Sequence, residues 1–362
     1  MNRTACALLG PRIGFWAAIG LASLLFAGLA QAQDITAPDR AAARKAEPRK
    51  AEQKSAPKLT LDQMIEPVVR IRVFINPDAR TIESLGYERD GSGIVIDDNG
   101  LVLTIGYLMV EAYAAEIVTN DGRKVPANIV GYDHETGFGL LQAVRPLKLR
   151  AMAFGKAADL KPGERVLASS YGGRDGTVPA FIAERREFAG PWEYLIDGAI
   201  FTTPAHSHWS GAALINREGK LVGVGSSLVH NVGGRFPGIA GNMYVPVDLL
   251  LPVLGDLLND GRARSDARPW LGMNTEEVDG QLMISRVTPA SPAAKSGLRR
   301  GDILRAVGGE KPRNLADLYR KIWARGKAGV KVPIDIERNG DRLHFDITSA
   351  NQQDHLLLKP TL

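Results

Sequence analysis

Short runs of alternating apolar and polar residues begin near residue 61 and continue to about residue 260. The first set contains the runs "EPVVRIRVFI", "GSGIVIDDNGLVLTI" and "FGLLQAV". Turn signals separate such runs at Asp98-Asn99-Gly100 and Asn120-Asp121-Gly122, where asparagine, aspartate and glycine tolerate the positive φ of tight hairpins. This spacing of strands and turns predicts an antiparallel sandwich or barrel.

A second set of strand-like runs follows, namely "VPAFIAERREF", "YLIDGAIFTT" and "GAALINREGKLVGVGSSLV". It ends where Pro246 opens a segment with leucines and valines at helical spacing, which stops before Gly261. Two strand-rich halves and a closing helix predict one double-barrel domain over residues 61–262.

A third region, residues 266–350, combines helix and strand signals. Ser291 followed by Pro292 is typical of an N-cap and a first-turn proline. Strand-like runs are "LMISRV", "VPIDIERNG" and "RLHFDI". One apolar helix stripe is formed by Leu315, Leu318, Ile322 and Trp323. This pattern predicts a separate α+β domain.

The first 32 residues have the pattern of a secretory signal peptide. Arg3 and Arg12 precede the uncharged run Ile13–Ala30, and a small-residue site ends at Ala32. This order predicts cleavage after Ala32 and a periplasmic or secreted protein. An uncleaved membrane anchor is the alternative, because the run just reaches the length that spans a bilayer.

Residues 33–60 are rich in Ala, Lys, Arg, Glu and Pro, and they hold seven Lys/Arg against four Asp/Glu. A segment that cannot bury apolar surface is expected to be a disordered linker. Most of the net charge of +5 lies in this linker and the leader, so the folded part is near neutral and nothing in it indicates nucleic acid. A solvated linker is favoured over contact between this basic segment and a membrane surface.

The one cysteine of the chain, Cys6, lies in the predicted leader. The mature chain therefore lacks the residue needed for a disulfide scaffold, a thiol nucleophile or a cysteine-based metal site.

Four segments in order resemble the chymotrypsin-fold protease domain of the HtrA/DegP family: "GSGIVIDDNGLVLT", "DGRKVPANIVGYD", "LLQA" and "SGAALINREGKLVGV". The segments "RPWLGM" and "TPASPAAKSGLRRGDILRAVGGEKPRNLADLYRKI" resemble a PDZ domain, the usual companion of such proteases. The resemblance implies a mainly β protein, with a trypsin-like double β-barrel followed by a C-terminal α+β PDZ domain and a tail over residues 351–362.

The resemblance also assigns the catalytic positions, and two of the three are replaced. The nucleophile motif reads "HWSGA", which keeps Ser210. The position of the catalytic histidine, in "TIGYLMV", is occupied by Tyr107, whose phenol is protonated at neutral pH and is a poor base for serine. The position of the orienting aspartate falls on Gly137, which has no side chain.

The oxyanion hole implied by the resemblance is formed by the backbone of residues 208 and 210. Relatives have glycine where this chain has His208, and a backbone angle easy for glycine is costly for histidine. The sequence thus predicts an impaired hole beside Ser210.

Other histidines of the chain are candidates to replace the missing base. His134 lies just before Gly137 and is expected in a surface turn, while His206 and His208 share the loop of Ser210. A metal site at His206 and His208, with His230, is a further alternative, but no neighbouring carboxylate is evident. No metal and no cofactor are expected.

PDZ folds bind an extended peptide at a sheet edge, and the backbone N–H groups of a tight loop hold its terminal carboxylate. The resemblance places this loop at Trp270, Leu271 and Gly272, with the strand from Met273 onward. The side-chain pocket is assigned to Leu271, Met273, Ile284, Leu318 and Ile322. The alternative is that these apolar residues are simply core.

The sequence therefore favours a catalytically silent envelope protein that binds peptide C-termini or unfolded envelope proteins. An active serine endopeptidase with an unconventional base and a metal-binding envelope protein are the alternatives. A homo-oligomer stays open, and the apolar C-terminal segment "HLLLKPTL" is a candidate to dock into the PDZ groove of a neighbour.

Overall fold

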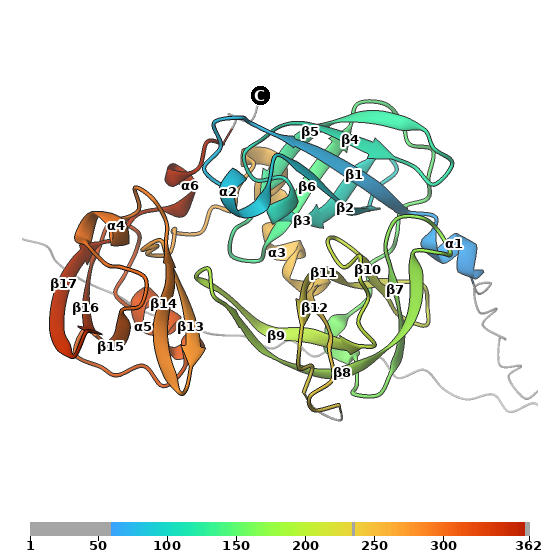
Figure 1. Ribbon diagram of the computed structural model, residues 1–362. Coiled ribbons are helices and arrows are strands. Elements are labelled where there is room, and N and C mark those ends of the chain that lie inside the picture. The colour runs from blue at the N-terminus through green and yellow to red at the C-terminus, as the bar shows by residue number, and fades with distance from the viewer. Residues whose placement is uncertain (1–58, 234–235, 359–362) are drawn as a thin grey trace, which may run out of the picture. The chain divides into compact units, whose positions relative to one another are not determined.

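The computed structural model describes residues 59–233 and 236–358. The first half of the double-barrel region is a closed six-stranded antiparallel barrel with the strand order β1-β2-β3-β6-β5-β4 (Figure 1). The strands are β1 (Val68–Ile75), β2 (Glu88–Val95), β3 (Leu101–Ile105), β4 (Ala112–Val118), β5 (Lys124–Tyr132) and β6 (Phe138–Ala143).

The predicted hairpin turns lie where strands of this barrel meet. Gly100, between β2 and β3, has φ +86°, and Gly122, between β4 and β5, has φ +85°. The Asp97 carboxylate accepts a hydrogen bond from the backbone N–H of Leu101 at 2.7 Å, which closes the first turn. The turn chemistry read from the sequence is therefore confirmed.

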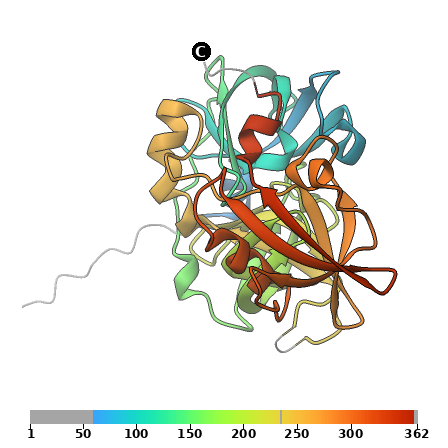
Figure 2. The ribbon, with the colours of Figure 1, turned by 90° about the vertical axis from the view of Figure 1, so that its left-hand side faces the viewer.

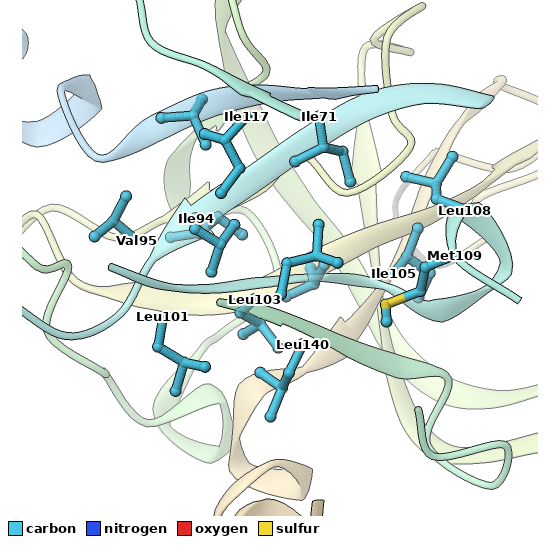
Figure 3. Packing of buried hydrophobic residues seen from close by; sticks show 14 of the residues in the cluster. Ile71, Ile94, Val95, Leu101, Leu103, Ile105, Leu108, Met109, Ile117 and Leu140 are labelled. Carbon is cyan, nitrogen blue, oxygen red and sulfur yellow. The ribbon is translucent and has the colours of Figure 1, made fainter. Parts of the chain in front are cut away.

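The interior of the first barrel is a hydrophobic core made mostly of aliphatic side chains (Figure 3). Ile71, Ile94, Leu103 and Leu140 come from four different strands, and each is fully buried. Along β1 buried and partly exposed positions alternate, as the period of two in the sequence predicts.

The second half closes a barrel of the same kind, in the order β10-β11-β12-β9-β8-β7. Its strands are β7 (Arg165–Ser169), β8 (Thr177–Gly190), β9 (Tyr194–Thr203), β10 (Ala213–Ile215), β11 (Leu221–Val229) and β12 (Gly241–Pro246). The trypsin-like double barrel expected from the sequence is confirmed.

The helices of the barrel region are short. They are α1 (Leu61–Ile65), α2 (Ile82–Leu85), η1 (Gly106–Leu108), η2 (Ala157–Asp159), η3 (Val247–Leu249) and α3 (Leu251–Asp260). The expected helix start at Pro246 is wrong, because Pro246 pairs as the last residue of β12 and a 3₁₀ turn separates it from α3. The end is as predicted, with Gly261 in the left-handed conformation at the C-cap.

The C-terminal domain is a five-stranded antiparallel sheet in the order β13-β14-β15-β16-β17 (Figure 2, orange to red). Ser291 caps α4 and Pro292 follows it, as predicted. The strands are β13 (Met273–Val278), β14 (Gln281–Val287), β15 (Ile303–Val307), β16 (Lys331–Arg338) and β17 (Asp341–Thr348). The helices are α4 (Pro292–Ser296), α5 (Leu315–Trp323) and α6 (Gln352–His355).

The described part of the C-terminal tail contacts the first barrel of its own chain. Arg80 Nη1 lies 2.7 Å from Nδ1 of His355, and the N–H of Leu357 donates to Oε1 of Glu111 at 2.8 Å. Docking of the tail into a neighbour's groove stays a prediction, because residues 359–362 lie outside the described residues.

The predicted leader and basic linker also lie outside the described residues, apart from Leu59 and Thr60. Among the residues that are described, none of the helices has the length and apolar character needed to cross a bilayer.

The first barrel depends on its fully buried leucines. We expect Leu103→Ala to lower the free energy of unfolding by about 2–5 kcal/mol, because it removes buried methyl groups and leaves a cavity. The matched control is Leu251→Ala, since Leu251 is 62% exposed and should change stability by less than about 0.5 kcal/mol. Equal effects of the two substitutions in urea denaturation would contradict the assignment of this core.

Candidate functional site

Ser210 lies in the loop between β9 and β10, and backbone contacts hold it between the two barrels. Its carbonyl accepts from the N–H of Ser92 in β2 at 2.8 Å, and the N–H of Gly211 donates to the carbonyl of Gly225 in β11 at 2.9 Å. Gly211 has φ +72°, and a Cβ there would lie 2.0 Å from the carbonyl oxygen of Ser92. The loop can therefore take this path only with glycine after the serine.

Tyr107, in η1 directly after β3, lies against Ser210. Its hydroxyl donates a hydrogen bond to Ser210 Oγ at 2.7 Å. Burial raises the pKa of Tyr107 to about 12, and hydrogen bonds with the side chains of Ser210 and Trp209 offset only part of that rise. At neutral pH the phenol is thus a donor toward the serine oxygen and cannot take up its proton.

Arg89 fixes the turn that carries Tyr107. Its Nη1 donates to the carbonyls of Tyr107 and Val110, at 2.7 and 3.0 Å, and the side chain is almost fully buried. Burial lowers the pKa of Arg89 to about 10, and attraction to Glu111 offsets part of this fall. This role of Arg89 could not be predicted from the sequence, because a single arginine in a strand does not indicate which backbone carbonyls it will contact.

Gly137 lies just before β6, where an aromatic hydroxyl fills the space a side chain would need. Its φ is +79°, and a Cβ at this position would lie 2.8 Å from the hydroxyl of Tyr194. That hydroxyl donates to the carbonyl of Thr136 at 2.8 Å, while the carbonyl of Gly137 accepts from the N–H of Gly106 at 2.6 Å. The backbone is thus packed without room for a carboxylate.

Histidines lie near Gly137 and Ser210 in the sequence, but none of those described is hydrogen bonded to Ser210. Nδ1 of His134 lies 2.8 Å from the hydroxyl of Tyr132, and burial lowers the pKa of His134 to about 4. His206 is buried with its backbone held by Asn242, and burial with a smaller contribution from His208 lowers the pKa of its ring. Within residues 59–233 and 236–358, none of the histidine rings is hydrogen bonded to Ser210.

His208 is exposed, and its φ lies outside the left-handed region. The expected strain of a histidine at a left-handed angle is therefore not present there. The rings of His206 and His208 have centroids 6.0 Å apart. No group of three His, Cys, Asp or Glu side chains suited to a metal ion occurs in the described part of the chain.

The predicted carboxylate loop of the C-terminal domain holds an acidic side chain of the second barrel. The backbone N–H groups of Leu271, Gly272 and Met273 donate to the carboxylate of Glu193 at 3.0, 2.6 and 3.0 Å. Glu193 lies in the turn between β8 and β9 and is 5% exposed. This contact of Glu193 could not be predicted from the sequence, because a glutamate in a hairpin turn is ordinarily exposed to solvent.

The apolar residues predicted to line the peptide pocket are all buried in one cluster. Leu195 of β9 belongs to the same cluster and is 8% exposed. The predicted pocket residues in it are Leu271, Met273, Ile284, Leu318 and Ile322. Trp270, the first residue of the predicted loop, is 7% exposed.

Two protein families match parts of the chain. The trypsin-like peptidase domain matches residues 91–224 and the PDZ domain matches residues 269–348. The order of these two domains is the one that the sequence resemblance implied. The chain is an HtrA/DegP-like protein.

Curated relatives of this HtrA/DegP-like chain are named "Probable periplasmic serine endoprotease DegP-like". One, from Pseudomonas putida (strain W619), is 30% identical over 277 residues, which are 73% of this chain and 56% of the relative. Another, from Marinomonas sp. (strain MWYL1), is 31% identical over 271 residues, 71% of this chain and 56% of the relative. The chain spans little more than half the length of these relatives, and their names agree with the predicted periplasmic location.

Solved structures with similarity to the chain include an "HtrA-type protease AlgW with tripeptide". The likeness covers 83% of this chain and 99% of that chain, with 20% sequence identity and a TM-score of 0.47.

The packing at Gly137 predicts a coupled effect on stability. We expect Gly137→Ala to cost about 2 kcal/mol or more, because alanine is strained at this φ and its Cβ meets the hydroxyl of Tyr194. In a Tyr194→Phe background the same change should cost about 1 kcal/mol less, since the obstructing oxygen is gone. Additive effects in a double-mutant cycle measured by chemical denaturation would contradict this packing.

Proposed function

We propose that this HtrA/DegP-like chain is catalytically silent and acts in the periplasm by binding peptide C-termini or unfolded envelope proteins through its PDZ domain. The observation that carries the proposal is the hydrogen bond from Tyr107 to Ser210 Oγ. The phenol is partly buried, and it contacts the serine from the position that the resemblance assigns to the catalytic base.

The chemical reason is the missing acceptor for a proton. A serine attacks an amide carbonyl efficiently only when a base removes its proton, and the base must be held by a third group. The pKa of Tyr107 is raised to about 12, so the phenol keeps its own proton at neutral pH. Gly137 supplies no orienting carboxylate. Loss of the base from such a triad lowers kcat by on the order of 10⁶-fold.

The PDZ domain supports a binding role because it keeps the parts that peptide recognition requires. Three successive backbone N–H groups, from Leu271 to Met273, converge on one carboxylate. β13 is an edge strand of its sheet, which is where an extended peptide adds as a further strand. These features favour a partner with a free C-terminal carboxylate.

A second candidate is an active endopeptidase, which the names of the curated relatives favour. It requires an unconventional base to reach Ser210, and no histidine ring among the described residues is hydrogen bonded to that serine. The metal-binding alternative has weaker support, because His206 and His208 stand without a third ligand among the described residues.

Proteolysis and active-site labelling test whether the chain lacks proteolytic activity. The mature chain should leave unfolded casein intact and should not react with a fluorophosphonate probe, because Ser210 has no base. Gel-based cleavage and fluorescent labelling should match those of the Ser210→Ala control, which lacks the hydroxyl. Cleavage or labelling that disappears in Ser210→Ala would overturn the silent reading and support the endopeptidase.

A further inference from the structure

The turn between β8 and β9 places a carboxylate in the loop that the proposed function reserves for a peptide C-terminus. Glu193 accepts from the N–H groups of Leu271, Gly272 and Met273, with Gly272 and Met273 sharing Oε1 and Leu271 bonding Oε2. Successive N–H groups that point at one concave site bind anions. A side-chain carboxylate thus makes the contacts that a chain-terminal carboxylate makes in a PDZ groove.

The same turn pairs with the edge strand. The N–H of Thr275 in β13 donates to the carbonyl of Pro191 at 2.9 Å. β13 has only β14 as a strand neighbour in its sheet, so Pro191 takes a backbone position open to an added peptide. This is a backbone hydrogen bond of the kind made in strand addition.

On its other side the turn is held by α5. The hydroxyl of Tyr319 donates to the carbonyl of Gly190 at 2.7 Å and accepts from the N–H of Glu193 at 3.2 Å. Leu195 packs in the apolar cluster that contains the predicted pocket residues Ile284 and Leu318. This turn therefore fills the carboxylate site and one backbone position of the strand edge, and Leu195 packs among the predicted pocket residues.

We propose that the segment Gly190–Leu195 is an internal stand-in for the peptide, so that a partner binds the PDZ groove by displacing Glu193. This inference rests on the proposed function, because it specifies how the same groove is opened. It also defines the ligand class as an extended chain end with a free carboxylate, since that group alone replaces all three bonds of Glu193.

Two energetically unfavourable features of Glu193 allow a peptide to displace this turn. Glu193 has φ +59°, a left-handed conformation that residues with a Cβ rarely adopt. Burial raises the pKa of its carboxyl to about 7 even though three N–H groups favour the charged form. A peptide carboxylate receives the same donors without the backbone strain, so it can compete with the turn.

Peptide binding to the full mature chain tests the displacement. Fluorescein-labelled hexapeptides that end in Leu, Val or Phe would be titrated against wild type and Glu193→Ala, with fluorescence anisotropy as the readout. We expect Glu193→Ala to bind at least about tenfold more tightly, because the fraction of open groove limits the apparent affinity of the wild type. C-terminally amidated peptides should bind neither protein.

The matched control is Glu218→Ala, which removes an exposed glutamate from another turn of the second barrel and should bind like wild type. Equal, measurable affinity of wild type and Glu193→Ala would overturn the stand-in role and leave the proposed peptide binding intact. Absence of binding to every variant would refute the proposed peptide binding itself, and this inference with it.

A second measurement covers the case in which Glu193→Ala fails to fold. Hydrogen exchange of the wild-type chain with saturating carboxylate peptide should become faster at residues 190–195 and stay slow at residues 271–273, because the peptide replaces the turn at the same donors. Unchanged or slower exchange at residues 190–195 in the peptide-bound state would overturn the displacement. Tyr319→Phe, which removes two bonds to the turn, should increase peptide affinity in the same direction as Glu193→Ala.

Discussion

The hydrogen bond between Tyr107 and Ser210 joins the two barrels at the point where a serine protease carries out its chemistry. Tyr107 comes from the first barrel and Ser210 from the second, and the bond is 2.7 Å long. A neutral phenol and a neutral hydroxyl satisfy each other without burying a charge, whereas an ion pair at the same place would require desolvation. Burial keeps the phenol protonated, and Arg89 holds the backbone that carries it. The contact therefore links the two barrels without placing a buried charge beside the serine.

The packing around Gly137, the residue that the resemblance assigns to the orienting aspartate, leaves no space for a side chain. The absence of a Cβ at Gly106 leaves room for the ring of Tyr132, and Gly137 leaves room for the hydroxyl of Tyr194. Between these glycines runs a backbone hydrogen bond of 2.6 Å. An aspartate at residue 137 would have to displace Tyr194 and adopt a strained φ. Packing and backbone geometry at residue 137 therefore oppose a carboxylate side chain at this position.

Much of the fold could be predicted from the sequence because its determinants are local. Strand alternation, the glycine turns at residues 100 and 122 and the capped α4 depend on neighbours within a few positions. The proximity of Tyr107 and Ser210, which lie 103 positions apart, came only from the family resemblance. The contact of Glu193 with the loop at residues 271–273 could not be predicted in either way. It depends on how a hairpin turn of the second barrel packs against the C-terminal domain, and the spacing of apolar and polar residues along the chain does not indicate such packing. His208 was expected to be strained, yet its φ lies outside the left-handed region.

In both sites of the chain, a group that would meet a substrate or ligand is satisfied internally, but the two contacts differ in cost. The hydroxyl pair is neutral, and neither Tyr107 nor Ser210 has a left-handed backbone angle. Glu193, by contrast, combines a left-handed backbone with a buried carboxyl whose pKa is raised to about 7. An external ligand displaces a strained contact most readily. Displacement of Glu193 releases its backbone strain, and the three N–H groups then bond to the carboxylate of the ligand. The contact between Tyr107 and Ser210 is therefore the fixed one, and the carboxylate loop of the C-terminal domain is the part in which the proposed binding changes the structure.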